Sequence, residues 1–148
     1  METKQRLEQA LHDAMRAQDD VSKRTIRMAL SSMKLEEVAQ GSALNEDAVI
    51  AILQKEVKLR QEAIQDAQKA NRADLVEKNE DEIIVLQKFL PQQLSPEELH
   101  QLAESVIAEL NASGPGDMGK VMKALLPQVA GRAPNDRVSQ AVRQILTT

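Results

Sequence analysis

The chain has 148 residues, of which 42% are apolar, and a formal net charge of −4. It contains no cysteine, which excludes disulfides, thiolate metal sites and cysteine nucleophiles. Phe89 is the only Phe, Tyr or Trp, and the remaining composition is rich in residues that favour helix. These properties predict an all-α protein with an aliphatic core.

The sequence offers little support for a cofactor, a metal or a membrane. No apolar run approaches the ~20 residues of a membrane span, and "METKQRLEQALHD" has no apolar signal segment. We therefore expect a cytoplasmic protein. His12 and His100 lie outside any metal-ligand spacing. The acidic stretch "EKNEDE", Glu77 to Glu82, lacks the pattern of a calcium loop and is expected to be a solvated helix face.

The first two helices are predicted from apolar periodicity over residues 2–18 and 20–40, with Gly41 ending the second. The second helix carries two apolar stripes instead of one. Because a helix that buries two stripes contacts two neighbours, we expect it to be covered on two sides. The residues of its second stripe are Val21, Met28 and Leu35.

The third helix is predicted to begin after Asn45, which can cap it, and to end near Asn71. Within it, Glu56 and Arg60 lie four residues apart among apolar positions, in the favourable order for an ion pair. We expect a partly buried structural pair. A fourth helix is predicted over 73–89.

The clearest helix-end and helix-start signals of the chain lie in "FLPQQLSPEELHQL". Pro91 ends one helix, and Ser95-Pro96-Glu97-Glu98 is a capping box with proline at the first helical position, which predicts a fifth helix to about residue 110. We place a domain boundary here, between an N-terminal bundle of residues 1–92 and a C-terminal domain of residues 93–148.

Two shorter helices complete the chain. One is predicted over 118–126, between a cap at Asp117 and Pro127, and the last over 135–146. The predicted architecture is therefore two unlike helical bundles, of about four and about three helices.

The stretch "GPGDMGKV", Gly114 to Val121, almost matches a phosphate-binding P-loop. Val121 stands where the motif needs a hydroxyl for Mg²⁺, and the preceding segment is a helix, not a buried strand. Nucleotide hydrolysis is therefore excluded as an interpretation. The turn and the Asp117 cap explain most of the stretch, but Gly119 costs about 1 kcal/mol in a helix. Close approach of another backbone or a ligand would account for it.

Charge is distributed unevenly along the chain. Residues 1–110 carry 14 Lys+Arg and 21 Asp+Glu, net −7, whereas residues 111–148 carry 5 and 2, net +3. A polyanion would therefore prefer the last quarter. A second basic face is possible on the second helix, although a plain solvated face is the simpler interpretation. Its residues are Lys23, Arg24, Arg27 and Lys34.

Residues 117–133, "DMGKVMKALLPQVAGRA", followed by "VSQAV", resemble the YqeY family, whose C-terminal part is similar to the tail of the B subunit of the tRNA-dependent Asp/Glu amidotransferase. The blocks "SKRTIRMALSSMK", "LQKEVKLRQEAI" and "FLPQQLSPEEL" also resemble this family, so the resemblance covers nearly the whole chain. Pro134-Asn135 departs from the Asp-Gly that the family often has there.

The resemblance implies two unlike helical bundles and a tail that helps to hold tRNA. The catalytic cradle of the amidotransferase has no counterpart here, so we assign no catalytic residues. The residues themselves and the resemblance together predict contacts with the backbone of folded RNA, without base reading. The residues expected to bind RNA are Gly119, Lys120, Lys123, Gly131, Arg132, Arg137 and Arg143.

Three functions follow as hypotheses. The first is a non-catalytic accessory protein that binds tRNA or another structured RNA, linked to tRNA-dependent amidation. The second is an adaptor that docks on an aminoacyl-tRNA synthetase or an amidotransferase subunit. The third, a glutamine-dependent carbon–nitrogen ligase, is implied by the family resemblance only. The sequence leaves the oligomeric state open.

Overall fold

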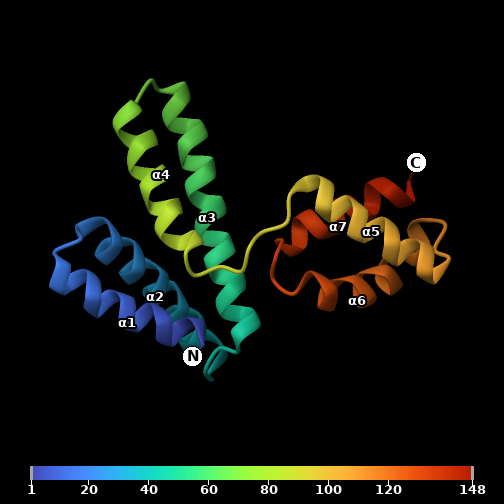
Figure 1. Cartoon of the computed structure of the whole chain (residues 1–148), viewed down its shortest axis with the longest axis horizontal. Coiled ribbons are helices and arrows are strands. Elements are labelled where there is room, and N and C mark those ends of the chain that lie inside the picture. The colour runs from blue at the N-terminus through green and yellow to red at the C-terminus, as the bar shows by residue number, and fades with distance from the viewer. Residues whose placement is uncertain (1, 148) are drawn as a thin grey trace. The chain divides into compact units, whose positions relative to one another are not determined.

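The computed structural model describes residues 2–147 and is all-α, which confirms the predicted fold class (Figure 1). No strand occurs among these residues. The elements, in chain order, are α1 (Thr3–Ala17), α2 (Asp20–Gln40), α3 (Glu46–Lys69), α4 (Ala73–Gln87), α5 (Pro96–Leu110), the 3₁₀ turn η1 (Pro115–Asp117), α6 (Met118–Val129) and α7 (Asn135–Leu146).

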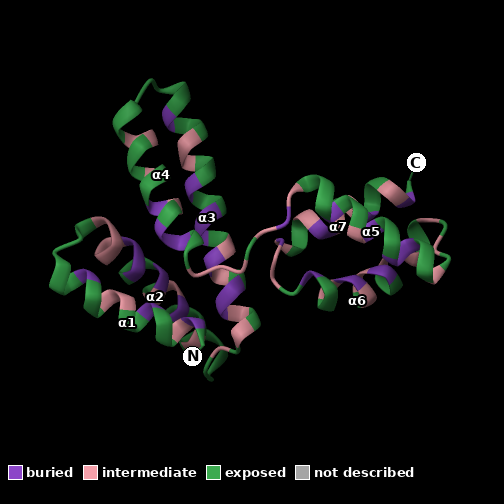
Figure 2. Cartoon of the chain, viewed as in Figure 1, coloured by how far each residue is buried: buried purple, intermediate pink, exposed green. Residues whose placement is uncertain are grey.

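The chain divides into two compact units, one ending at Leu90 and the next beginning at Pro91. Each unit has its own apolar core, so each contains what an independently stable domain needs. Figure 2 shows the buried residues lining the sides on which helices of one unit face each other. The first core is built from Leu7, Ile26, Ala29, Met33, Val49, Leu53, Val57, Val85 and Leu86.

In the first unit, α3 is the longest helix, with 24 residues, and packs against α1, α2 and α4. The α3–α4 hairpin extends beyond α1 and α2 in Figure 1. In the second unit, α5, α6 and α7 all pack on one another. Their shared core is aliphatic and includes Leu99, Val106, Val121, Leu125 and Val142.

Capping side chains begin three helices where the sequence indicates. Asp19 accepts a hydrogen bond from the Ser22 backbone N–H, and Asn45 accepts one from Ala48. Ser95 and Glu98 form the reciprocal capping box of α5. Each bond satisfies a donor that the first turn of a helix leaves without an intrahelical partner.

Two local predictions around α6 are wrong. Asp117 does not cap the helix; its Oδ2 instead accepts a hydrogen bond from the Ser113 backbone N–H at 3.0 Å. The η1 turn runs directly into α6 and leaves no extended capping residue between them. Pro127 does not end α6, which continues to Val129. Proline removes only one intrahelical hydrogen bond, and Pro127 is exposed, so water can reach the freed carbonyl.

A buried ionic network joins three helices of the first unit. Arg60 Nη1 donates to Glu56 Oε2 at 2.8 Å, which confirms the expected pair. Arg60 Nε also donates to Glu82 Oε1 of α4 at 3.0 Å. Ser32 of α2 donates to Glu56 Oε1 at 2.8 Å. The prediction that the whole acidic stretch of α4 is solvated is therefore wrong for Glu82, which is only 4% exposed.

The network generates a stability prediction. Glu82→Ala leaves two arginines without their shared carboxylate, and removal of one partner of a buried pair costs about 3–5 kcal/mol. We expect the free energy of unfolding to fall by about 3 kcal/mol. Urea unfolding followed by circular dichroism measures this change. Exposed Glu77 on the same helix is the matched control, and Glu77→Ala should change stability by less than about 0.5 kcal/mol. Equal unfolding of the two variants would contradict the structural role of the network.

Candidate nucleic-acid interface

Charge is segregated by helix in the second unit. Residues 91–148 carry five Lys+Arg and six Asp+Glu, net −1, so the unit as a whole is not basic. All five cations belong to α6, α7 and the turn between them. Four of the six acids belong to α5: Glu97, Glu98, Glu104 and Glu109. A polyanion therefore meets a cationic face only on the α6–α7 side of this unit.

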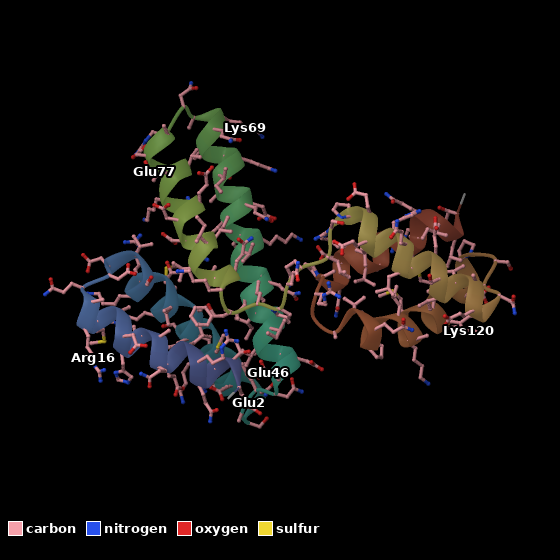
Figure 3. All side chains as sticks on the ribbon, in the orientation of Figure 1. Glu2, Arg16, Glu46, Lys69, Glu77 and Lys120 are labelled. Atoms are coloured by element: carbon pink, nitrogen blue, oxygen red, sulfur yellow. The ribbon has the colours of Figure 1, made fainter. Side chains whose placement is uncertain are left out.

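The start of α6 carries three of the seven residues expected to bind RNA. A Cβ added to Gly119 would meet no atom of residues 2–147 within 4 Å, so no neighbour described by the structure excludes a larger residue there. Lys120, which Figure 3 labels, donates from its Nζ to the carbonyl of Leu110, the last residue of α5, at 3.3 Å. A cation is favourable at this helix end. Lys123 is exposed and lies on the same outer side of α6.

The turn after α6 holds Gly131 and Arg132 in a different environment. Arg132 Nε donates to the Gln92 carbonyl at 3.0 Å, and the Leu94 N–H donates to the Arg132 carbonyl at 2.7 Å. Gln93 Nε2 donates to the Gly131 carbonyl at 3.2 Å. We call this set of contacts the 92–94 clasp. It binds the segment that leads into α5 to the α6–α7 turn.

No sequence signal indicates the clasp, because its partners lie about forty residues apart and are mostly backbone groups. Gly131 has φ 77°, in the left-handed region that glycine adopts readily. A structural reason therefore exists for both Gly131 and Arg132, beside any contact with RNA.

The last two candidate residues lie on α7. Arg137 and Arg143 are six residues apart, which places them about 120° apart around the helix and about 9 Å apart along it. Arg137 is half-buried near the start of α7, whereas Arg143 is exposed in its last turn. Because α6 is 12 residues long, its ends are about 18 Å apart, so Gly119 and Lys120 at its start lie well away from Gly131 and Arg132 just beyond its end.

The four cations of the candidate second basic face on α2 lie in two kinds of environment. Lys23 Nζ lies 3.4 Å from Asp20, and Arg24 Nη2 donates to buried Glu82 at 3.3 Å. Arg24 Nε is buried without a hydrogen-bond partner, although the side chain as a whole is 41% exposed. Arg27 and Lys34 are exposed. Of the four candidate cations of α2, these two remain for contact with a partner.

Within residues 2–147, no group of three or more His, Asp or Glu side chains is arranged to hold a metal ion. None of the helices that the structure describes combines the length and apolar character required to cross a membrane.

Hydrogen bonds from the backbone N–H and side chain of Ser95 hold the pKa of Glu98 below its usual range, and nearby Arg132 lowers it further. The folded state therefore favours the Glu98 carboxylate, and this stabilisation is present above the usual carboxyl range. It is lost as pH falls through the lowered pKa.

These features define an all-helical protein of two compact units, the second with its five cations confined to α6, α7 and the turn between them. The chain belongs to the YqeY family: a family model described as Yqey-like protein matches residues 4–146.

Its similar relatives include proteins called "Altered inheritance of mitochondria protein 41, mitochondrial". That of Lachancea thermotolerans is 38% identical over 112 residues, covering 74% of this chain and 60% of the relative. That of Vanderwaltozyma polyspora is 35% identical over 107 residues, covering 70% and 58%. That of Pyrenophora tritici-repentis is 26% identical over 144 residues, covering 95% and 79%. The chain thus spans about 60% of the length of the first two.

Glycine geometry allows a paired test. Gly119 is helical with open space around it, so Gly119→Ala should raise the free energy of unfolding by up to about 1 kcal/mol. Gly41 has equally open surroundings but φ 75°, so Gly41→Ala should lower it by about 1 kcal/mol. Urea unfolding measures both, and destabilisation by Gly119→Ala would show that the chain itself needs this glycine.

Glu98 gives a pH test. An NMR titration of its carboxyl group should give a midpoint below the usual glutamate range, and Ser95→Ala should raise that midpoint because one donor is removed. Glu98→Gln should in turn weaken the dependence of stability on pH as the solution is acidified below about pH 5. An unchanged midpoint in Ser95→Ala would contradict this account.

Proposed function

We propose that this chain is a non-catalytic accessory protein that binds tRNA or another folded RNA through the cationic face of α6 and α7. The observation that carries the proposal is the start of α6. There Gly119 has open space around it, and Lys120 and Lys123 lie on the same outer side of the helix, although the Met118 N–H already donates to the Pro115 carbonyl. A phosphate group can approach the backbone closely at such a place.

The face is suited to recognition of a sugar–phosphate backbone. Residues 91–148 contain no Phe, Tyr or Trp, so bases cannot stack on aromatic side chains there. Lys123 and Arg143 are exposed, whereas Arg132 is engaged in the 92–94 clasp and Lys120 contacts the end of α5. With so few available cations, binding should be modest and strongly dependent on salt.

A link to tRNA-dependent amidation rests on the resemblance of the second unit to the amidotransferase tail. In this proposal the chain presents or holds RNA for a partner and performs no amidation itself. A cytoplasmic location belongs to the proposal too; the relatives named above are mitochondrial proteins by name.

Charge reversal tests the proposal. We expect Lys123→Glu with Arg143→Glu to weaken binding of unmodified tRNA at least tenfold and to reduce the slope of log K against log salt by about 1–2. Fluorescence anisotropy between about 50 and 200 mM salt measures both quantities. The matched control is Lys55→Glu with Lys69→Glu, two exposed lysines of the first unit that make the same change in net charge.

Gly119→Ala adds a separate measurement. It should weaken tRNA binding even though it stabilises the fold, because its methyl group occupies the open space at the start of α6. No binding at low salt, salt-independent binding, or equal losses in the control variant would overturn the proposal.

A further inference from the structure

One face of α2 carries a row of apolar side chains in solvent. Leu35 is 72% exposed, Val38 70% and Met28 49%. Spacings of seven and three residues place them on one side of the helix. We call these three residues the α2 stripe. As expected, α2 contacts neighbours on more than one side, namely α1, α3 and α4, but Met28 and Leu35 of its second stripe remain exposed.

The α2 stripe is held on a rigid support. Ser32, between Met28 and Leu35, donates to buried Glu56, and Arg60 Nη2 lies 3.7 Å from Met28 Sδ. Residue numbers rise along α2 as they fall along α3 in these contacts, so the helices are antiparallel here. Leu59 of α3 is also 49% exposed. A partner would therefore meet a preformed surface.

Cations border the α2 stripe. Arg27 precedes Met28, and Lys34 precedes Leu35 and lies one helical turn before Val38. We call Arg27 and Lys34 the basic ridge. Lys34 contributes to the lowered pKa of Glu37, whose main cause is its hydrogen bond from Lys4. The positive charge of the ridge differs in sign from that of its unit, because residues 1–90 carry 14 Lys+Arg and 17 Asp+Glu, net −3.

We propose that the α2 stripe and basic ridge dock an amphipathic helix of a partner protein, one with an apolar row edged by acidic residues. Apolar positions at three- and four-residue spacing on that helix would match the stripe, and its acids would face the ridge. This surface belongs to the first unit and is independent of the proposed RNA binding.

Other occupants fit less well. A second copy meeting through the same face carries the same cationic ridge, and beside its stripe it offers one exposed acid, Glu36, instead of a row of acids. An anionic membrane would be opposed by the net −3 charge of residues 1–90. Bases of RNA would find no aromatic side chain in the stripe on which to stack.

The test uses the full chain and a synthetic peptide of about 18 residues, long enough to form a helix. The peptide has leucines at three- and four-residue spacing and glutamates along one edge; a second peptide has lysines in their place. We expect the acidic peptide to bind, and Leu35→Ser with Val38→Ser to weaken its binding at least tenfold. Because both residues are largely exposed, these changes should leave the fold intact.

Charge exchange gives the sharper measurement. Arg27→Glu with Lys34→Glu should reduce binding of the acidic peptide at least tenfold and create binding of the lysine peptide. Ile84→Ser, at another exposed apolar residue, is the matched control and should change nothing. Lys123→Glu with Arg143→Glu should also leave peptide binding unchanged, which separates this surface from the proposed RNA face.

Three results would overturn the proposal. One is no binding, or binding that the stripe variants do not weaken. Another is a concentration-dependent dimer that Leu35→Ser with Val38→Ser converts to monomer, which would identify a second copy as the occupant. The third is binding to phosphatidylcholine vesicles containing about 30% phosphatidylserine that the same variants abolish without any peptide binding, which would identify a lipid surface.

Discussion

The first unit depends on a single buried guanidinium. Arg60 is 5% exposed and binds the carboxylates of Glu56 on its own helix and Glu82 on α4. Burying such a group is costly unless its donors are satisfied. The network therefore fixes which residues of α4 and α2 lie against α3. It also positions Met28 and Ser32, and through them the exposed side of α2.

Sequence periodicity and capping were sufficient for the helices, because these signals are local. The Glu56–Arg60 pair could be predicted for the same reason, since its members are one helical turn apart. Glu82 could not, because its partner lies 22 residues earlier and its burial depends on how the hairpin closes. The predicted cap at Asp117 was wrong because a short 3₁₀ turn leads directly into α6. The predicted helix end before Pro127 was wrong because a proline in the last turn of a helix removes only one hydrogen bond.

The candidate RNA site was predictable in composition but not in geometry. The sequence indicates which cations the last quarter contains, but it cannot show that Arg132 is engaged with the Gln92 carbonyl or Lys120 with the end of α5. Both contacts join segments distant in sequence to backbone carbonyls, which carry no residue-specific signal. Only once those contacts are known can Lys123 and Arg143 be singled out as exposed cations that take no part in them.

Four of the six acids of the second unit lie on α5, and all five cations lie on α6, α7 and the turn between them, so the unit has an electric dipole with almost no net charge. A polyanion approaching such a body exerts a torque on it before contact, turning the cationic helices forward and the acidic helix away. Association is then selected by orientation, and salt that shortens the reach of the field removes this alignment along with the attraction. Moving a single glutamate from α5 to α7 would weaken the alignment while leaving the net charge untouched.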